Sequence, residues 1–315
     1  MTVKSVRQQF ADTMMEVGQE DPDLVVLVGD ISHFVLQPFA QACPGRYFNV
    51  GICEPTMLSM AAGLARSGFY PVVHTISPFI IERSFEQIKL DFCYQKLGGN
   101  LVTVGSAFDY SNLGSTHHCY GDFALMKTLD GAQITYPSTA LEFDTLFRQV
   151  YQSGKITLYR VPGTQHSQEF LRSDIQFGKA IKVVEGRNLT IVATGPQLDS
   201  AIGARDVLAG KGWDVEIIYV HTIRPLDGEL VRASISKTRN VLTIEEHSRS
   251  GGLGDEILRA TVDIPDVRYS FKAIPDQFIT GYGTYHDHCE SLGLTPEGIV
   301  QAVDVDFGPQ GPAVD

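Results

Sequence analysis

The feature of this sequence that most constrains its fold is a repeated alternation of short strand-like runs with longer segments of helical periodicity. In the first half, apolar and β-branched residues form short runs bounded by Gly, Pro or polar residues, at 24–28, 47–50, 70–74, 100–104, 133–136 and 156–159. Helical patterns lie around them, at 5–20, 57–65, 79–96, 122–129 and 139–152. Strands separated by helices pair in parallel, because each helix returns the chain to the start of the next strand.

The same alternation resumes in the second half after a break. Residues 161–170 mix Pro, Gly and polar residues without periodicity and are expected to connect two domains. Beyond them, strands are predicted at 188–194, 215–219 and 240–245, and helices at 199–211, at 227–236 and from Thr295 onward. The Gly- and Pro-rich end after Phe307 is expected to be frayed.

The sequence therefore predicts an α/β protein of two domains, each a mostly parallel sheet flanked by helices. The first domain is expected at residues 1–165, a linker at 166–177, and the second domain at 178–307.

Composition narrows the classes of partner. The chain has 315 residues, of which 43% are hydrophobic, and a formal net charge of −12. Without a basic surface that neutralises phosphates, we expect no nucleic-acid partner. The apolar runs are far shorter than the roughly 20 residues of a membrane-spanning helix, and the first residues lack the apolar centre of a signal peptide. We therefore expect no membrane partner and a cytoplasmic location.

The number and spacing of the cysteines bear on disulfides and metal sites. The chain has five, widely scattered and without a C-x-x-C pair. An odd number without close spacing argues against a disulfide framework or a zinc site. We expect reduced thiols and no metal ligands among them.

One carboxylate stands at an unusual position. Glu54 follows a turn at Gly51 and precedes Pro55, so it falls at or next to the N-cap of the helix expected there. Glutamate caps poorly, because its side chain is too long to fold back efficiently onto the free N–H groups. Glu54 is therefore either a surface acid favoured by the helix dipole or a group that points at a ligand.

Further candidates follow predicted strands, at the edge where open α/β sheets bind ligands. Ser32 and His33 follow the first strand, where they could reach a substrate, although a solvated loop explains them equally well. Arg160 follows the last strand of the first domain. A basic residue there could pair with a phosphate or carboxylate of a substrate, or it could simply be exposed.

A loop and a helix add the remaining candidates. Residues 105–118 form a loop rich in Gly, Ser and Asn that ends in His117 and His118. The two histidines are too few and wrongly spaced for a metal site, but histidine is suited to proton transfer at substrate hydroxyls. The helix near Phe79 carries Arg83, and the Phe79 ring could hold a heterocycle or pack in the core.

Four phrases resemble the transketolase family: RYFNVGICE, which ends at Glu54, FIIERSFEQ, GSTHH and EEHSRSGGLG. The resemblance covers residues 5–303 and implies the second subunit of a split, thiamine-diphosphate-dependent transketolase, made of a pyrimidine-binding domain and a C-terminal domain. It implies that Glu54 contacts the pyrimidine ring of thiamine diphosphate, with Phe79 stacked on that ring and Ile52 and Arg83 beside it. It also implies that His117 lies beside the reacting carbons of the substrate, with His118 next to it and Arg160 near an anionic group.

The resemblance further implies a partner. In the family, a Gly-Asp-Gly phrase and a later Asn hold the magnesium ion and the diphosphate, and this sequence has no Gly-Asp-Gly. We therefore expect thiamine diphosphate and Mg²⁺ as cofactors, the ion being held mainly by an N-terminal, diphosphate-binding transketolase subunit in an α2β2 assembly.

Two departures from the family concern the substrate, which the resemblance implies to be a small sugar. Leu113 stands where the family has an acidic residue, and Gly105 stands where it has a sugar-binding histidine. The cofactor residues match, whereas the substrate pocket differs.

Three functions remain open. The first is transketolase activity, in which a two-carbon ketol unit passes from a ketose donor to an aldose acceptor and Glu54 activates the cofactor. The second is a decarboxylating relative, either the β subunit of a 2-oxo-acid dehydrogenase or a deoxyxylulose-phosphate-synthase-like enzyme. The third is a non-catalytic regulatory paralogue, against which the presence of Glu54, Phe79 and His117 argues.

Overall fold

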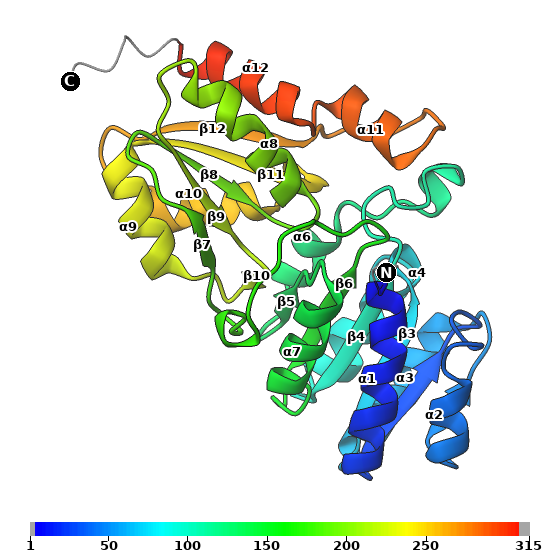
Figure 1. The fold of residues 1–315 in the computed structure, drawn as a ribbon. Helices are drawn as coiled ribbons and strands as arrows, with labels where there is room; N and C mark the ends of the chain where they lie inside the picture. The colour runs from blue at the N-terminus through cyan, green and yellow to red at the C-terminus, as the bar shows by residue number, and fades with distance from the viewer. Residues whose placement is uncertain (1–3, 309–315) are drawn as a thin grey trace.

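The computed structural model describes residues 4–308 and consists of two sheets with helices on their faces (Figure 1). The expected fraying after Phe307 concerns residues that lie almost entirely outside this range. The first sheet has the strand order β10-β5-β6-β4-β3-β1-β2, and all its pairings are parallel except that of β10. Its parallel strands are β1 (Leu24–Val28), β2 (Tyr47–Asn49), β3 (Tyr70–Ile76), β4 (Gly99–Val104), β5 (Gln133–Thr135) and β6 (Ile156–Val161).

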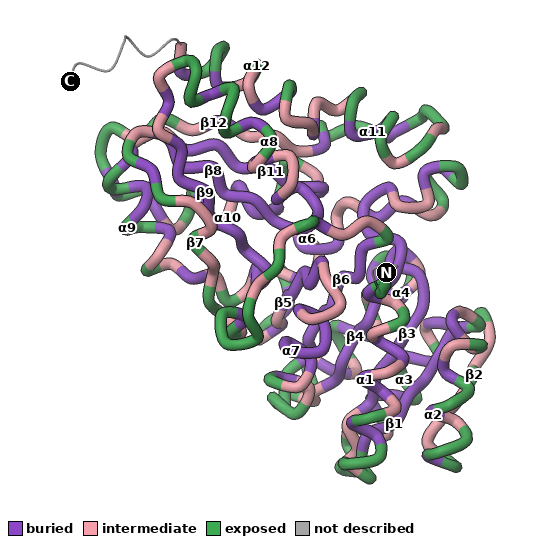
Figure 2. Tube along the Cα trace, in the orientation of Figure 1, coloured by how far each residue is buried: buried purple, intermediate pink, exposed green. Residues whose placement is uncertain are grey.

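Strand β1 illustrates why these segments are strands. All five of its residues are buried, because helices cover both faces of the sheet. Leu24, Val26 and Val28 belong to the core beneath α1 (Val6–Glu20), α2 (Gln37–Ala42) and α7 (Ala140–Val150). Val25 and Leu27 point to the other core, where α3 (Glu54–Arg66) packs. The buried trace in Figure 2 accordingly follows the strands through the middle of the molecule.

The second sheet confirms the other half of the expected architecture. Its order is β12-β11-β8-β9-β7, with only β7 antiparallel at one edge. Its strands are β7 (Ile181–Val184), β8 (Leu189–Ala193), β9 (Val215–Tyr219), β11 (Asn240–Ser248) and β12 (Arg268–Ile274). Its helices are α8 (Gln197–Ala209), α9 (Gly228–Thr238), α10 (Leu253–Thr261), α11 (Tyr285–Leu292) and α12 (Pro296–Asp306).

The helix expected over residues 79–96 is wrong as a single element. The structure divides this stretch into α4 (Ser77–Ile81), α5 (Phe85–Gln87) and a π-helix, η1 (Ile88–Cys93). The break lies at Ser84, whose hydroxyl donates a hydrogen bond to the Phe79 carbonyl at 3.0 Å. A serine that bonds to nearby backbone competes with the regular helical hydrogen bonds, which explains why periodicity alone did not reveal the break.

The first sheet and one hydrophobic core contain residues from both domains. Strand β10 (Thr222–Arg224) comes from the second half of the chain but pairs antiparallel with β5 of the first sheet. One hydrophobic cluster joins Ile134 and Leu158 of the first sheet to Ile218 of the second and to Ile223 of β10. The domains therefore form one packed body.

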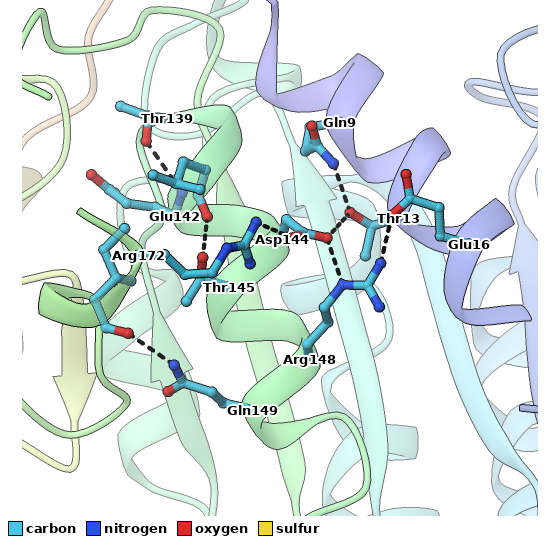
Figure 3. A network of polar contacts seen from close by, with 12 residues as sticks. Gln9, Thr13, Glu16, Thr139, Glu142, Asp144, Thr145, Arg148, Gln149 and Arg172 are labelled. Atoms are coloured by element: carbon cyan, nitrogen blue, oxygen red, sulfur yellow. Dashed lines mark hydrogen bonds and ion pairs between the residues drawn. The ribbon is translucent and has the colours of Figure 1, made fainter. Parts of the chain in front are cut away.

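The linker is fastened to the first domain by a polar network (Figure 3). On α7, Asp144 accepts hydrogen bonds from Thr13 of α1 and from Arg148, both at 2.9 Å. Arg172, in the short turn η3 (Arg172–Asp174) of the linker, forms an ion pair with Asp144 at 2.8 Å. Burial alone would raise the pKa of Asp144, but the hydrogen bonds from Arg148 and Arg172 outweigh burial and lower it below its usual 3.8.

A buried histidine lies on β3 beneath α1. The His74 ring is fully buried, packs on Phe10 at 4.5 Å between ring centroids, and donates from Nδ1 to the Val102 carbonyl at 2.8 Å. Burial lowers the pKa of His74 from its usual 6.5 to about 3. The ring is therefore neutral at physiological pH.

This histidine makes stability depend on pH in a defined direction. Above pH 6.5, His74 is neutral in both the folded and the unfolded chain. As the pH falls from 6.5 towards 3, only the unfolded chain binds the proton, so wild-type stability is lost. We expect the stability difference between wild type and His74→Gln to shrink by about 2 kcal/mol between pH 7 and pH 5. Urea unfolding at both pH values measures this, with the exposed His286→Gln as control. An equal difference at both pH values would contradict the prediction.

Candidate functional site

The candidate site is built around the first residue of α3. The N-cap residue before it, Cys53, makes no side-chain capping bond. Glu54 itself is only 1% exposed. Arg83 donates from Nη1 to Glu54 Oε2 at 2.8 Å, whereas Oε1 is buried and has no hydrogen-bond partner among residues 4–308. The surface-acid alternative is therefore wrong. A buried carboxylate with one oxygen held and the other open is arranged to accept a hydrogen bond from a ligand.

Two further predicted residues join Glu54 through Arg83. The Arg83 guanidinium lies over the Phe79 ring, 4.2 Å from its centroid. Phe79 in turn meets the His117 ring edge to face, with 5.4 Å between centroids. Glu54, Arg83, Phe79 and His117 thus form one continuous cluster of carboxylate, guanidinium, phenyl and imidazole, although they come from three separate segments.

Ile52 and Cys53 lie at the rim of this cluster. Gly51 adopts a φ of +77°, which turns the chain between β2 and α3. Ile52 is 71% exposed, and Cys53 is exposed as well. An exposed apolar side chain two residues before a buried glutamate is available to a ligand or to a second protein surface.

Ser32 and His33 lie apart from the cluster. The Ser32 hydroxyl accepts from Arg7 Nε at 2.7 Å and lies 2.7 Å from Nε2 of His74. Because the neutral His74 uses its Nδ1 proton on Val102, its Nε2 must accept the Ser32 proton. Ser32 is thus largely committed to protein partners. The neighbouring His33 packs on Phe34 and lines a hollow of about 420 Å³ together with Arg7.

His118 faces the second domain, away from Phe79. It is 3% exposed, and its ring meets that of His288 on α11 edge to face at 5.7 Å. Burial, followed by the nearby His288, lowers the pKa of His118. Neither ring nitrogen of His118 has a hydrogen-bond partner among the described residues, so a substrate contact by His118 stays a prediction.

The expectation for Arg160 is corrected. It is fully buried within β6, where its Nε forms an ion pair with Asp122 at 2.9 Å and its Nη2 donates to the Glu246 carbonyl at 2.9 Å. Its guanidinium lies 4.6 Å from the ring centroids of Phe123 and Tyr136. It is neither an exposed strand end nor an open anion site, because the second domain covers this end of the sheet.

Sequence reasoning missed two residues of this region. Tyr110 meets the ring of His117 edge to face at 5.9 Å, so the imidazole lies next to two aromatic rings. The signal was a second aromatic residue, two positions after Phe108, in a loop otherwise rich in Gly, Ser and Asn. Asp122 was missed as the partner of Arg160, although an acid at the start of a helix, shortly after GSTHH, was visible in the sequence.

The part of the chain that the structure describes contains no group of three His, Cys, Asp or Glu side chains arranged to hold a metal. It also contains no helix long and apolar enough to cross a membrane. The cluster around Glu54 offers an open carboxylate oxygen and an aromatic ring, which suit an organic ligand with hydrogen-bond donors and an aromatic face.

Comparison with known families agrees with this organisation. Residues 3–162 match the transketolase pyrimidine binding domain, and residues 178–299 match the transketolase C-terminal domain.

Named relatives share most of the chain. It is 31% identical over 296 residues to a subunit of the apulose-4-phosphate transketolase of Phocaeicola vulgatus, covering 93% of this chain and 94% of that protein. It is 31% identical over 305 residues to the 6-deoxy-6-sulfo-D-fructose transketolase subunit SqwH of a Clostridium species, covering 94% and 92%. It is 29% identical to the 1-deoxy-D-xylulose-5-phosphate synthase of Syntrophomonas wolfei, covering 96% of this chain but only 48% of that protein.

Solved structures show the same fold. A split-gene transketolase, described as an inactive β4 tetramer, matches with a TM-score of 0.88 and 28% identity, covering 98% of this chain and all of that chain. A transketolase from Pichia stipitis matches with a TM-score of 0.79 and 15% identity, which shows a shared fold. Two adjacent domain matches and relatives that align along nearly the whole chain lead to one conclusion: the protein belongs to the transketolase family and comprises its pyrimidine-binding and C-terminal domains.

Proposed function

We propose that this chain is the pyrimidine-binding subunit of a two-subunit transketolase that moves a two-carbon ketol unit from a ketose donor to an aldose acceptor. The observation that carries the proposal is the buried Glu54, which is held by Arg83 through one oxygen and open at the other, beside Phe79 and His117. A non-catalytic paralogue would have no need to keep a buried, half-satisfied carboxylate, because such a group costs stability.

The surroundings of Glu54 support thiamine diphosphate as the cofactor. The open Oε1 would accept a hydrogen bond from a protonated pyrimidine nitrogen, and Arg83 holds the carboxylate in position for that contact. Phe79 would offer an apolar surface to the same ring. When bound, thiamine diphosphate supplies an electron sink for carbon–carbon bond cleavage.

His117 is proposed to act on the substrate hydroxyls. Its Nδ1 lies 2.9 Å from the Thr116 hydroxyl, and its Nε2 has no hydrogen-bond partner among residues 4–308. An imidazole oriented through one nitrogen can accept or donate a proton with the other.

A partner subunit is part of the proposal. This sequence has no Gly-Asp-Gly, so Mg²⁺ and the diphosphate would be held mainly by a diphosphate-binding subunit, in an α2β2 assembly. The names of the relatives support a divided enzyme, since two of them are named as transketolase subunits and the split-gene structure is inactive as β4. All five cysteines are unpaired, which supports a cytoplasmic location.

A deoxyxylulose-phosphate-synthase-like activity is the second candidate. The relative from Syntrophomonas wolfei and the altered positions Gly105 and Leu113 favour it. That relative is about twice as long as this chain, however, whereas this chain covers 94% and 92% of the two transketolase subunits. A requirement for a 2-oxo acid substrate would select the synthase-like activity.

The first prediction from this proposed function concerns Glu54. Glu54→Gln in the reconstituted two-subunit enzyme is expected to lower kcat by about 100-fold or more, because a neutral amide replaces a pre-organised charged acceptor. Steady-state kinetics and thermal unfolding measure activity and folding. The control is Glu229→Gln on α9, whose side chain is 90% exposed and which should leave kcat unchanged. Near-normal turnover by Glu54→Gln would contradict the proposed role of Glu54 in activating the cofactor.

The second prediction concerns assembly. The isolated chain is expected to bind thiamine diphosphate and Mg²⁺ weakly, since it lacks the Gly-Asp-Gly phrase of the diphosphate site. The diphosphate carries most of the cofactor's charge, so its contacts contribute strongly to binding. Calorimetric titration with and without the partner subunit measures the difference. Micromolar binding by the isolated chain would show that the diphosphate site lies within it.

The third prediction concerns the donor. Xylulose 5-phosphate is expected to be a poor donor, because neither Gly105 nor Leu113 offers a hydrogen-bonding side chain to the sugar. An unmatched polar group typically costs about 1–3 kcal/mol. A screen of phosphorylated and unphosphorylated ketoses and of 2-oxo acids tests this, and xylulose 5-phosphate as clearly the best donor would contradict it.

A further inference from the structure

The loop between β4 and His117 carries an unusual pair of positions. Gly105 closes β4 with a φ of +74°, a conformation that favours glycine. A Cβ atom at this position would lie 2.3 Å from Cε2 and 2.5 Å from Cδ2 of Tyr110. The Tyr110 ring and a side chain at position 105 therefore exclude each other, and the ring takes the space.

The same ring borders the imidazole that the proposed function uses. Tyr110 and Phe79 each meet His117 edge to face, at 5.9 Å and 5.4 Å. Because Nδ1 of His117 contacts Thr116, Nε2 remains for a ligand. A substrate bound at Nε2 would therefore lie near the Tyr110 ring.

The backbone around Tyr110 holds it in place. Asp109 accepts hydrogen bonds from the Ser106 N–H at 2.9 Å, from the Ser106 hydroxyl at 3.0 Å and from the Gly163 N–H at 2.8 Å. The Tyr110 carbonyl accepts from the Leu113 N–H at 2.9 Å. These hydrogen bonds fix the turn that carries the Tyr110 ring. A side chain that determines specificity has to be held in place in this way.

The hydroxyl of Tyr110 distinguishes it from a core residue. Tyr110 is half-buried, and its hydroxyl makes no hydrogen bond to any residue in the range 4–308. Buried tyrosines of this protein behave differently: the hydroxyls of Tyr136, Tyr159 and Tyr219 all contact polar side chains. A partly buried phenol without a protein partner has a donor available for a ligand.

We propose that Tyr110 is a specificity-determining residue for the ketose donor. Its ring, which fills the space that a side chain at position 105 would need, stacks on a C–H face of the sugar, and its hydroxyl donates a hydrogen bond to one sugar oxygen. The site would therefore select ketoses that present C–H groups, including those of deoxygenated carbon atoms, to the Tyr110 ring. This inference rests on the proposed transketolase function.

The test uses the assembled two-subunit enzyme with a panel of ketose donors that differ by single deoxygenations. Tyr110→Phe keeps the ring and is expected to lower kcat/KM for the best donor about tenfold, mainly through KM. A donor that lacks the oxygen read by the phenol should lose little, so the donor ranking changes. The control is Tyr269→Phe, which removes a hydroxyl bonded to Thr261 in the second domain and should leave the ranking intact.

A binding measurement separates recognition from turnover. Calorimetric binding of the polyol form of the best donor, which cannot transfer a ketol unit, should weaken about tenfold in Tyr110→Phe and more in Tyr110→Ala. If Tyr110→Ala fails to fold, the Phe variant still decides.

An equal loss for every donor, or an unchanged ranking and polyol affinity in Tyr110→Phe, would overturn the role of Tyr110 while leaving ketol transfer by the wild type intact. A wild-type enzyme that transfers no ketol unit from any donor would overturn both proposals.

Discussion

The arrangement of this protein depends on one buried charge pair, Arg160 and Asp122. Arg160 lies near the end of β6, Asp122 begins α6 (Asp122–Lys127), and the guanidinium also donates to the carbonyl of Glu246 on β11 of the second domain. Neither side chain is exposed, so removing one partner would leave an uncompensated charge, which typically costs about 3–5 kcal/mol. The pair therefore fixes the second domain against the edge of the first sheet where the candidate site lies.

Arg160 of the same pair also fixes the end of the loop of residues 105–118. Arg160 donates to the Cys119 carbonyl, directly after His118, and the Cys119 N–H donates to the Ala107 carbonyl near the loop's beginning. Both ends of the loop that carries Tyr110 and His117 are thus anchored to the core. A site built this way is pre-organised, because its side chains do not have to be ordered when a ligand binds.

The sequence predicted those parts of the fold that local pattern determines. Strands β1 and β9 were predicted to the residue, because β1 is an apolar run of five residues and β9 is such a run interrupted only by Glu216. The edge strands β7, β10 and β12 were missed, since their pairing depends on distant neighbours. In the site, Glu54, Phe79, Arg83 and His117 were predicted and do lie together, because their segments meet at one edge of the sheet. Ser32, His118 and Arg160 have protein partners far away in the sequence, and no local pattern reveals such partners.

Strand β10 has a consequence for how such a chain can be divided. It is the one place where backbone from the second half of the described chain completes the first sheet, and Ile223 within it belongs to the shared core. Cutting the chain in the linker would leave the edge of β5 unpaired and that part of the core open to water. Each domain therefore depends on the other for part of its sheet edge or its core, and neither is structurally independent.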